Sequence, residues 1–252
     1  MPLTRILFLA SGITELPANG ALQKFSEALL EVKPELGDDL KGFISASVKW
    51  RPKGKFLVNK NLQPPIVGQS PLRYSAKGEP QLAQWIEKSA QAMGLWAEAT
   101  EEWGLDFGHL HPLMLLRPEA DRLVIPVSLS QMSPEAHRKW GIAIRKGSQK
   151  WPDPLTLIVS GSLSFRPDLA EGQEETLKAK QFDDDVIEYL RSGTIGKLDE
   201  MERSLFKAAQ PEGGSGSLYF LWGALGENVS GKVYHYQRPY PGIGRTAILF
   251  TL

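Results

Sequence analysis

The chain contains no cysteine among its 252 residues. This absence excludes disulfides, thiolate metal sites and a cysteine nucleophile together. It also fits a reducing cytoplasm, where we expect the protein to be located. There is no excess of either charge, because 29 Lys and Arg residues balance 29 Asp and Glu residues. A neutral chain lacks the basic surface typical of nucleic-acid and anionic-membrane binding, so neither is expected as a partner.

Long apolar runs are absent as well. No stretch approaches 18 consecutive apolar residues, so no membrane span is predicted. The short apolar run from Ile6 to Ala10 is followed by turn residues, which favours a buried strand over a secretory signal. The remaining composition, 42% hydrophobic and 23% charged, is that of an ordinary globular protein. We expect one domain over residues 1–252.

Short apolar segments alternate along the chain with longer amphipathic ones. The pattern predicts strands at residues 5–10, 40–50, 122–130, 155–164, 231–239 and 245–252. It predicts helices at residues 21–32, 81–95, 133–147, 182–193 and 198–209, a helix or buried strand at 217–225, and loops at 51–71 and 210–217. This alternation is typical of an α/β fold with a central mixed β-sheet flanked by helices.

Several residues mark the expected ends of these elements. Ser133 followed by Pro134 is the signature of a helix N-terminus, and Gly193 is placed to end a helix. We interpret the acidic run 183–185 as the first turn of a helix, where carboxylates oppose the helix dipole. The continuous apolar run at 155–164 suits a central strand that is buried on both faces.

Two of the four histidines, His109 and His111, are separated by one residue and lie close to Asp106. On a strand, residues two apart face the same side, so both imidazoles could approach one metal ion with Asp106 as a third ligand. The alternative is a pair of partly buried, hydrogen-bonded histidines. We interpret His137 as a solvated or locally bonded residue of a polar helix, and His235 lies in a late strand. A metal site built on this pair would have few other ligands to draw on.

One long segment carries a set of ordered motifs. Residues 74–83 follow the pattern Y-x-A-x-G-x-P-x-L-A, and residues 104–113 follow GLDHG-x-x-x-PL except that Phe107 replaces the histidine. Segments similar to an IPV-x-x-x-S strand and to SGS-x-x-HNL come next, at residues 125–131 and 160–169. In this order, the motifs resemble those of the class III extradiol ring-cleavage dioxygenases, the family of the protocatechuate 4,5-dioxygenase catalytic subunit. The resemblance implies that family's α/β fold.

The resemblance also implies where a metal site would lie. Members of the family hold Fe(II) with two histidines and a glutamate, and use a further histidine as acid and base. The first iron histidine falls on Ser11, and the second, in an S-x-H-W motif, is nearest to Ser47. The glutamate falls at about Gly216, and the acid/base histidine falls on Phe165. All these residues are neutral, and a serine hydroxyl is a poor Fe(II) ligand beside imidazole and carboxylate. The resemblance therefore implies no metal or other cofactor in this chain.

Some two-component enzymes of the family, such as the 2-aminophenol 1,6-dioxygenases, pair a catalytic chain with a homologous chain that lacks the iron site. The present sequence resembles that non-catalytic partner. We therefore expect a subunit that stabilises a homologous catalytic subunit, in which Fe(II) cleaves a catechol or 2-aminophenol ring. The residues expected around the vestigial pocket are Ser11, Ser47, Phe107, His109, His111, Ser164, Phe165 and Tyr219.

Three alternatives remain open from the sequence. The old pocket could support altered chemistry through His109, His111, Ser164 and Tyr219. It could instead bind a small aromatic ligand, with Phe107 and Phe165 as the walls of the pocket. A shifted alignment of the first 60 residues could also hide an acidic ligand, and the candidates are Glu15, Asp38 and Asp39.

Overall fold

The computed structural model describes residues 2–10, 20–68, 73–169, 173–238 and 242–252. Its strands are β1 (Leu3–Ala10), β2 (Gly42–Ser47), β3 (Phe56–Asn59), β4 (Ala97–Thr100), β5 (Leu123–Ser128), β6 (Leu155–Gly161), β7 (Gly231–Gln237) and β8 (Arg245–Thr251). Its α-helices are α1 (Gly20–Val32), α2 (Pro80–Gln91), α3 (Phe107–Leu116), α4 (Pro134–Ser148), α5 (Glu174–Ser192), α6 (Arg203–Ala209) and α7 (Gly216–Leu225). Two short 3₁₀ helices are η1 (Lys33–Leu36) and η2 (Ile195–Asp199).

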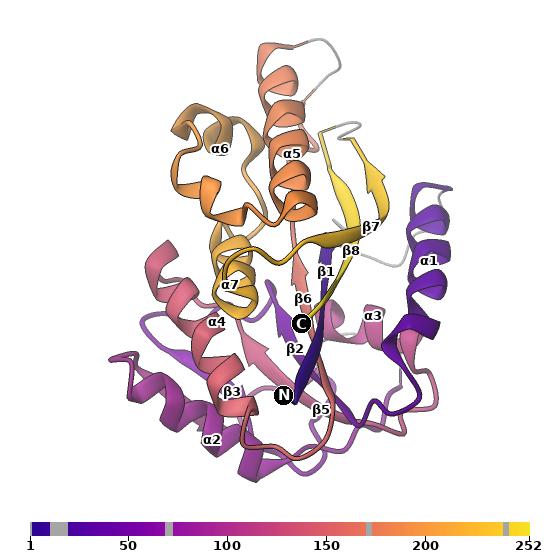
Figure 1. Ribbon diagram of the computed structural model, residues 1–252, viewed down its shortest axis with the longest axis vertical. Coiled ribbons are helices and arrows are strands. Elements are labelled where there is room, and N and C mark those ends of the chain that lie inside the picture. Colours follow the sequence, from indigo (N-terminus) through magenta and orange to yellow (C-terminus); the bar gives the residue numbers. More distant parts are fainter. Residues whose placement is uncertain (1, 11–19, 69–72, 170–172, 239–241) are drawn as a thin grey trace.

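The strands form one mixed sheet in the order β4-β3-β5-β2-β6-β1-β8-β7 (Figure 1). The central strands β5, β2, β6 and β1 are parallel, so their carboxyl ends lie at the same edge. Strands β3 and β8 pair antiparallel with the two sides of this parallel core. The fold is thus the expected single α/β unit with a mixed central sheet.

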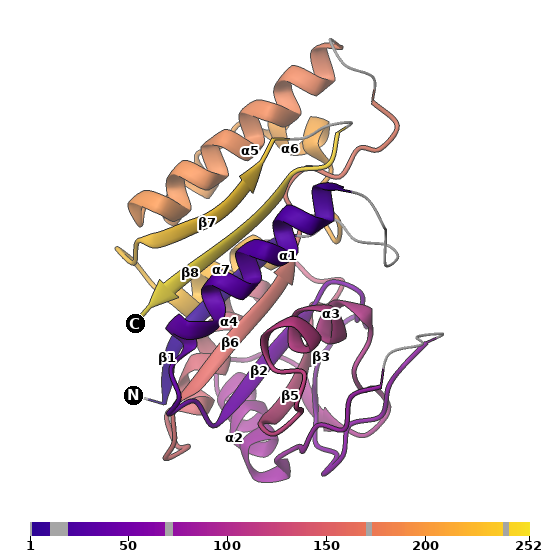
Figure 2. The same ribbon diagram turned by 90° about the vertical axis from the view of Figure 1, so that its right-hand side faces the viewer.

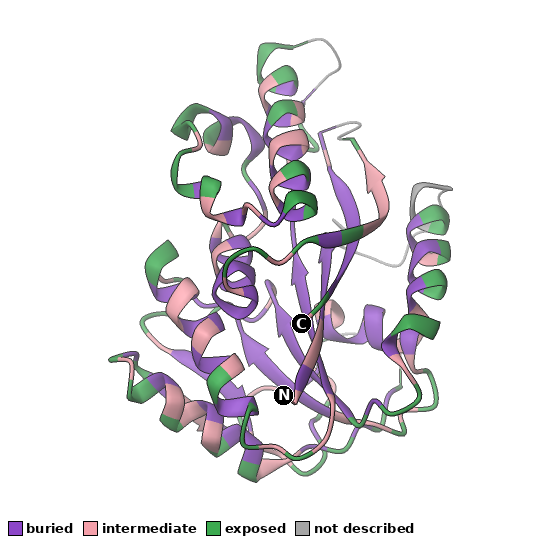
Figure 3. Ribbon diagram, in the orientation of Figure 1, coloured by how far each residue is buried: buried purple, intermediate pink, exposed green. Residues whose placement is uncertain are grey.

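Helices cover both faces of the sheet, as Figure 2 shows. Alternate residues of β1 point to opposite faces: Ile6 and Phe8 belong to the larger hydrophobic core, while Leu7 and Leu9 belong to the smaller one. Helices α2, α4, α5 and α7 contribute to the larger core, and α1 and α3 to the smaller. The central strands are buried on both sides (Figure 3). In β6 every residue is buried, as its continuous apolar run predicts.

Several local predictions are confirmed. The Ser133 hydroxyl accepts a hydrogen bond from the backbone N–H of Ala136 and caps α4, with Pro134 in the first turn. Gly193 ends α5 in the left-handed conformation, with a φ of 77°. The ambiguous segment at 217–225 lies in a helix, α7. None of the described helices has the length and apolar character needed to cross a membrane.

Other predictions are wrong. Strand β3 lies within the segment predicted as a loop, and β4 was not predicted, because four-residue strands are too short to show a period. Residues 198–209 form the end of η2, a break and α6 instead of one helix. The acidic run 183–185 lies in the middle of α5, which begins at Glu174. Its first member, Asp183, is fully buried, so the run does not serve the helix dipole.

Candidate functional site

A pocket lies at the carboxyl ends of β1, β2 and β6, the edge where α/β folds commonly bind ligands. Helices α1 and α3 and the segment between α6 and α7 form its other walls. Its lining residues are Leu9, Phe25, Val48, Lys49, Phe107, Gly108, His111, Pro112, Ser160, Gly161 and Glu212. These side chains pack closely and leave room for about one water molecule.

Two opposite charges meet in this pocket. Lys49 lies in the turn that follows β2, and its ammonium forms an ion pair with the Glu212 carboxylate. The Lys49 side chain is 29% exposed and that of Glu212 is 23% exposed, so both are partly shielded from bulk water. The Arg51 guanidinium donates a hydrogen bond of 3.2 Å to the backbone oxygen of Gly213, which adds a second link between the same two segments.

His111 is the imidazole that faces the pocket. Its ring stacks on Phe25, with 6.2 Å between ring centroids, and on Phe107, with 6.0 Å. Burial lowers the pKa of His111 to about 4, because no carboxylate compensates the lost solvation of the imidazolium. The ring is therefore neutral at pH 7, and a neutral imidazole can accept a hydrogen bond or ligate a cation.

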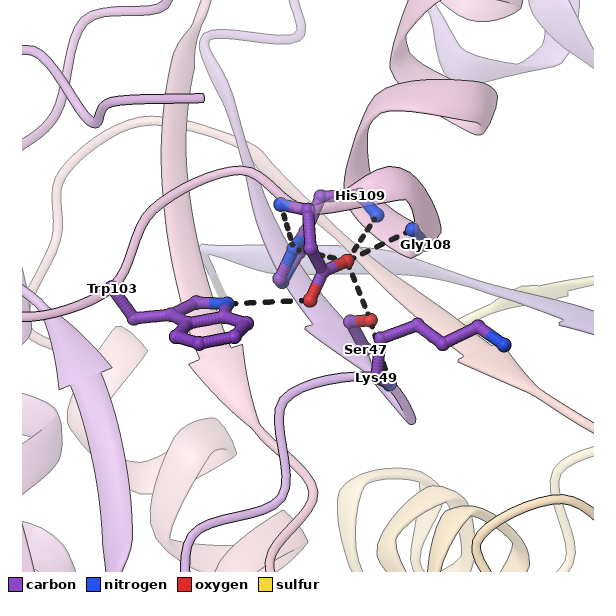
Figure 4. A network of polar contacts seen from close by, with 6 residues as sticks. Ser47, Lys49, Trp103, Gly108 and His109 are labelled. Carbon is purple, nitrogen blue, oxygen red and sulfur yellow. Dashed lines mark hydrogen bonds and ion pairs between the residues drawn. The ribbon is translucent and has the colours of Figure 1, made fainter. Parts of the chain in front are cut away.

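Behind the pocket, Asp106 organises a buried polar network (Figure 4). Its Oδ1 accepts hydrogen bonds from the Ser47 hydroxyl (2.8 Å) and from the backbone N–H of Gly108 (2.8 Å), and its Oδ2 accepts one from the Trp103 indole (3.3 Å). Burial opposes the charge on Asp106, but the adjacent His109 and these donors outweigh it and lower the pKa of the carboxyl. Asp106 caps α3 and joins it to β2.

His109 belongs to this network and not to the pocket wall. Its side chain is fully buried, and Nδ1 lies 3.1 Å from Asp106 Oδ1 and 3.3 Å from the Asp106 backbone nitrogen. The prediction that His109 and His111 share one face of a strand is wrong, because both lie on helix α3. Residues two apart on an α-helix point about 200° away from each other. His109 and His111 therefore cannot coordinate the same metal ion.

The other two histidines are also positioned by packing. His137 is buried, so the interpretation as a solvated residue is wrong, although its local bond is correct: Nδ1 lies 2.9 Å from the backbone oxygen of Ser133. A side chain at Gly216 would meet this ring, since an added Cβ would lie 2.7 Å from His137 Nε2. His235, half-buried on β7, packs edge-on against Phe25. Burial lowers the pKa of both imidazoles.

The residues that the sequence predicts around one pocket do not all lie together in the structure. Phe107 and His111 line the pocket, and the Ser47 hydroxyl lies just beneath it, against Gly108. Ser164 is buried and hydrogen-bonds to Asp183, while the Tyr219 hydroxyl donates to Asp199 at 2.8 Å. Phe165 is half-buried beside β8 and pairs with Ile243. None of these last three residues lines the pocket in the described part of the chain, and Ser11 and Glu15 lie outside the described residues.

The residues of this site do not fit Fe(II). Within the ranges that the structure describes, no three His, Asp or Glu side chains gather in a way that could hold a metal ion. An ammonium has no lone pair to donate, so Lys49 repels a cation where a ligand would be needed. Gly216, where the resemblance puts a glutamate, has no space for a side chain.

Lys49 and Glu212 are not among the residues predicted from the sequence, although a motif in the sequence points to Lys49. Residues 47–50 read S-V-K-W, which matches the S-x-H-W motif with Lys49 in place of the histidine. The structure agrees with this reading, because Lys49 lines the pocket whereas Ser47 turns toward Asp106. Glu212 lies four residues before Gly216 and is the carboxylate that reaches the pocket.

Comparison with known proteins places the chain in a family. Residues 63–251 match the family model described as the catalytic LigB subunit of aromatic ring-opening dioxygenase. The chain belongs to this family. The LigB match confirms the resemblance seen in the motifs, but it begins after residues 11 and 47–50, so it does not bear on the two histidine positions.

One relative matches in sequence, and one solved structure matches in fold. The chain is 30% identical over 172 residues to a 4,5-DOPA dioxygenase extradiol of Beta vulgaris, a match that covers 65% of this chain and 62% of that protein. Less than two thirds of that relative's length is therefore matched. The fold resembles the crystal structure of an uncharacterized Escherichia coli K12 protein, with a TM-score of 0.73, 16% identity and coverage of 98% and 99% of the two chains.

Proposed function

We propose that this LigB-family chain is a non-catalytic subunit of a heteromeric extradiol dioxygenase. In this proposal it stabilises a homologous catalytic subunit that holds Fe(II) and cleaves a catechol or 2-aminophenol ring. The observation that carries the proposal is the Lys49–Glu212 ion pair, which places a cation in the pocket where the catalytic members need a ligand. Phe107 and Phe165, at positions of family histidines, support it further.

The retained fold is consistent with a role in assembly. The sheet, both hydrophobic cores and the α3 capping network are built as in a stable single domain. A chain that binds only the folded form of its partner stabilises that partner by mass action, without chemistry of its own. We therefore expect the catalytic chain to unfold at a higher temperature in the presence of this subunit.

The test has two parts. The isolated chain, expressed in iron-supplemented medium, should contain far less than one iron per chain and should not cleave catechol or 2-aminophenol in an absorbance assay. A homologous chain that keeps the S-x-H-W histidine should then be identified by co-purification from the source cells, and its ring-cleaving activity should rise when this subunit is added. One iron per isolated chain together with ring cleavage would refute the proposal.

A second candidate, binding of a small aromatic ligand, is favoured by the stacked rings of Phe25, His111 and Phe107 beside the Lys49 ammonium. The small space between them argues against it in this conformation. Calorimetric titration with benzoate and 2-aminophenol separates the candidates, because heat that disappears in Lys49→Met would support binding. The third reading, altered chemistry by His109, His111, Ser164 and Tyr219, has less support because these residues do not meet in one described pocket.

A further inference from the structure

The Lys49–Glu212 pair differs from the other ion pairs of the described chain in where it lies. Most of those pairs, such as Lys232–Glu35 with side chains 62% and 44% exposed, lie on the open surface, where an ion pair contributes little stability. Lys49 and Glu212 instead project from two segments into a pocket at the carboxyl ends of parallel strands. The ammonium is the hydrogen-bond partner shown for the Glu212 carboxylate.

The rest of the pocket supplies ligands for a cation. Glu212 contributes carboxylate oxygens and His111 a neutral imidazole, which are donors that divalent transition metals accept. These two side chains fall one short of the three protein ligands common in metal centres that react with substrate. The ammonium of Lys49 lines the same pocket and is paired with the Glu212 carboxylate.

We propose that Lys49 takes the place of a metal ion in this pocket, and that it is the residue that keeps divalent cations out. The ammonium neutralises Glu212, adds a like charge that repels a second cation, and removes the ligand that a histidine would provide there. This inference rests on the proposed function, for which it supplies a physical cause. Beyond that function, a single side chain, Lys49, decides whether the pocket binds a metal ion.

The experiment measures Co(II) binding to the full chain by equilibrium dialysis with metal analysis, and by the visible absorption of bound Co(II). The variants are Lys49→His, which removes the ammonium and adds a ligand, and Lys49→Met, which only removes the ammonium. The double variant Lys49→His with Glu212→Gln tests the carboxylate. Lys232→His is the matched control, because it breaks a lysine–glutamate pair outside the pocket.

We expect Lys49→His to bind one Co(II) at least about tenfold more tightly than the wild type, through one added ligand and one removed like charge. The gain should vanish in the double variant and be absent in Lys232→His. Equal affinity of folded Lys49→His and wild type would overturn the inference, and so would tight stoichiometric binding by the wild type.

If Lys49→His does not fold, Lys49→Met still tests the inference. Lys49→Met should then bind Co(II) measurably more tightly than the wild type, and an unchanged affinity would refute the inference. The two proposals can also fail separately. A metal-free wild type that activates its partner supports the proposed function, even if Lys49→His gains no metal. A wild type that binds iron and cleaves rings would remove both.

Discussion

Replacing Asp183 with asparagine should make the chain more stable at alkaline pH than the wild type. Asp183 lies in the middle of α5 and is fully buried. Its Oδ1 accepts a hydrogen bond of 2.7 Å from the Ser164 backbone N–H, and its Oδ2 lies 2.8 Å from the Ser164 hydroxyl. A Cβ added at Gly244 would overlap Oδ2, so the carboxyl has no room for hydration on that side.

Burial raises the pKa of Asp183 from 3.8 to about 7, against the two hydrogen bonds from Ser164 and with a small contribution from the charge of Asp184. A raised pKa means that the protonated form stabilises the fold. That contribution is complete below pH 3.8 and is lost as the pH rises through 7. At about 1.4 kcal/mol per pKa unit, the loss between pH 5 and pH 8 is about 2.5 kcal/mol.

The assay is urea unfolding at pH 5, 6.5 and 8, followed by the fluorescence of the seven tryptophans. The quantity to compare is the free energy of unfolding of Asp183→Asn minus that of the wild type, because other titrating groups cancel in the difference. This difference should rise by about 2.5 kcal/mol from pH 5 to pH 8. A difference that stays constant with pH would show that Asp183 titrates normally and would refute the argument.

Three further predictions concern the site and its supports. Asp106→Ala should lower the free energy of unfolding at pH 7 by about 2–3 kcal/mol, since it removes the α3 cap and leaves buried donors unpaired. The contribution of Asp106 is present at neutral pH and is lost as the pH falls through its lowered pKa. A cost below about 0.5 kcal/mol in urea unfolding would contradict this expectation. Gly223→Ala should destabilise by about 1–3 kcal/mol in thermal unfolding, because its Cβ would overlap the backbone oxygen of Arg138 where α7 crosses α4, and an unchanged melting temperature would count against that close crossing. The His111 imidazole should titrate near pH 4 in an NMR titration, and a midpoint close to 6.5 would mean that the ring is open to water.

Much of the fold could be predicted from local patterns. The buried central strand β6, the capped start of α4 and the glycine at the end of α5 each depend on a few consecutive residues. Such signals act within one element, so they hold whatever the rest of the chain does. Family membership could be predicted from the sequence for a similar reason, because the motifs of residues 71–169 lie in one continuous stretch.

The errors arose where tertiary contacts override local preference. Residues 107–116 contain an internal proline and are apolar on nearly all sides, yet they form helix α3, because Asp106 caps its start and the smaller hydrophobic core surrounds it. An aspartate side chain usually lies at the surface, but Asp183 is buried because α5 packs on the sheet along that side. The amino-acid composition of a helix does not predict which of its faces will be buried.

Fold class, most of the larger elements and family membership could be predicted from the amino-acid sequence. Which side chains line the pocket depends on contacts between distant segments. Lys49 and Glu212 are 163 positions apart, and they meet because β2 pairs with β6 while α7 packs against β6. An ion pair between distant segments leaves no periodic signal in either one. It therefore becomes visible only after the strands have been placed side by side.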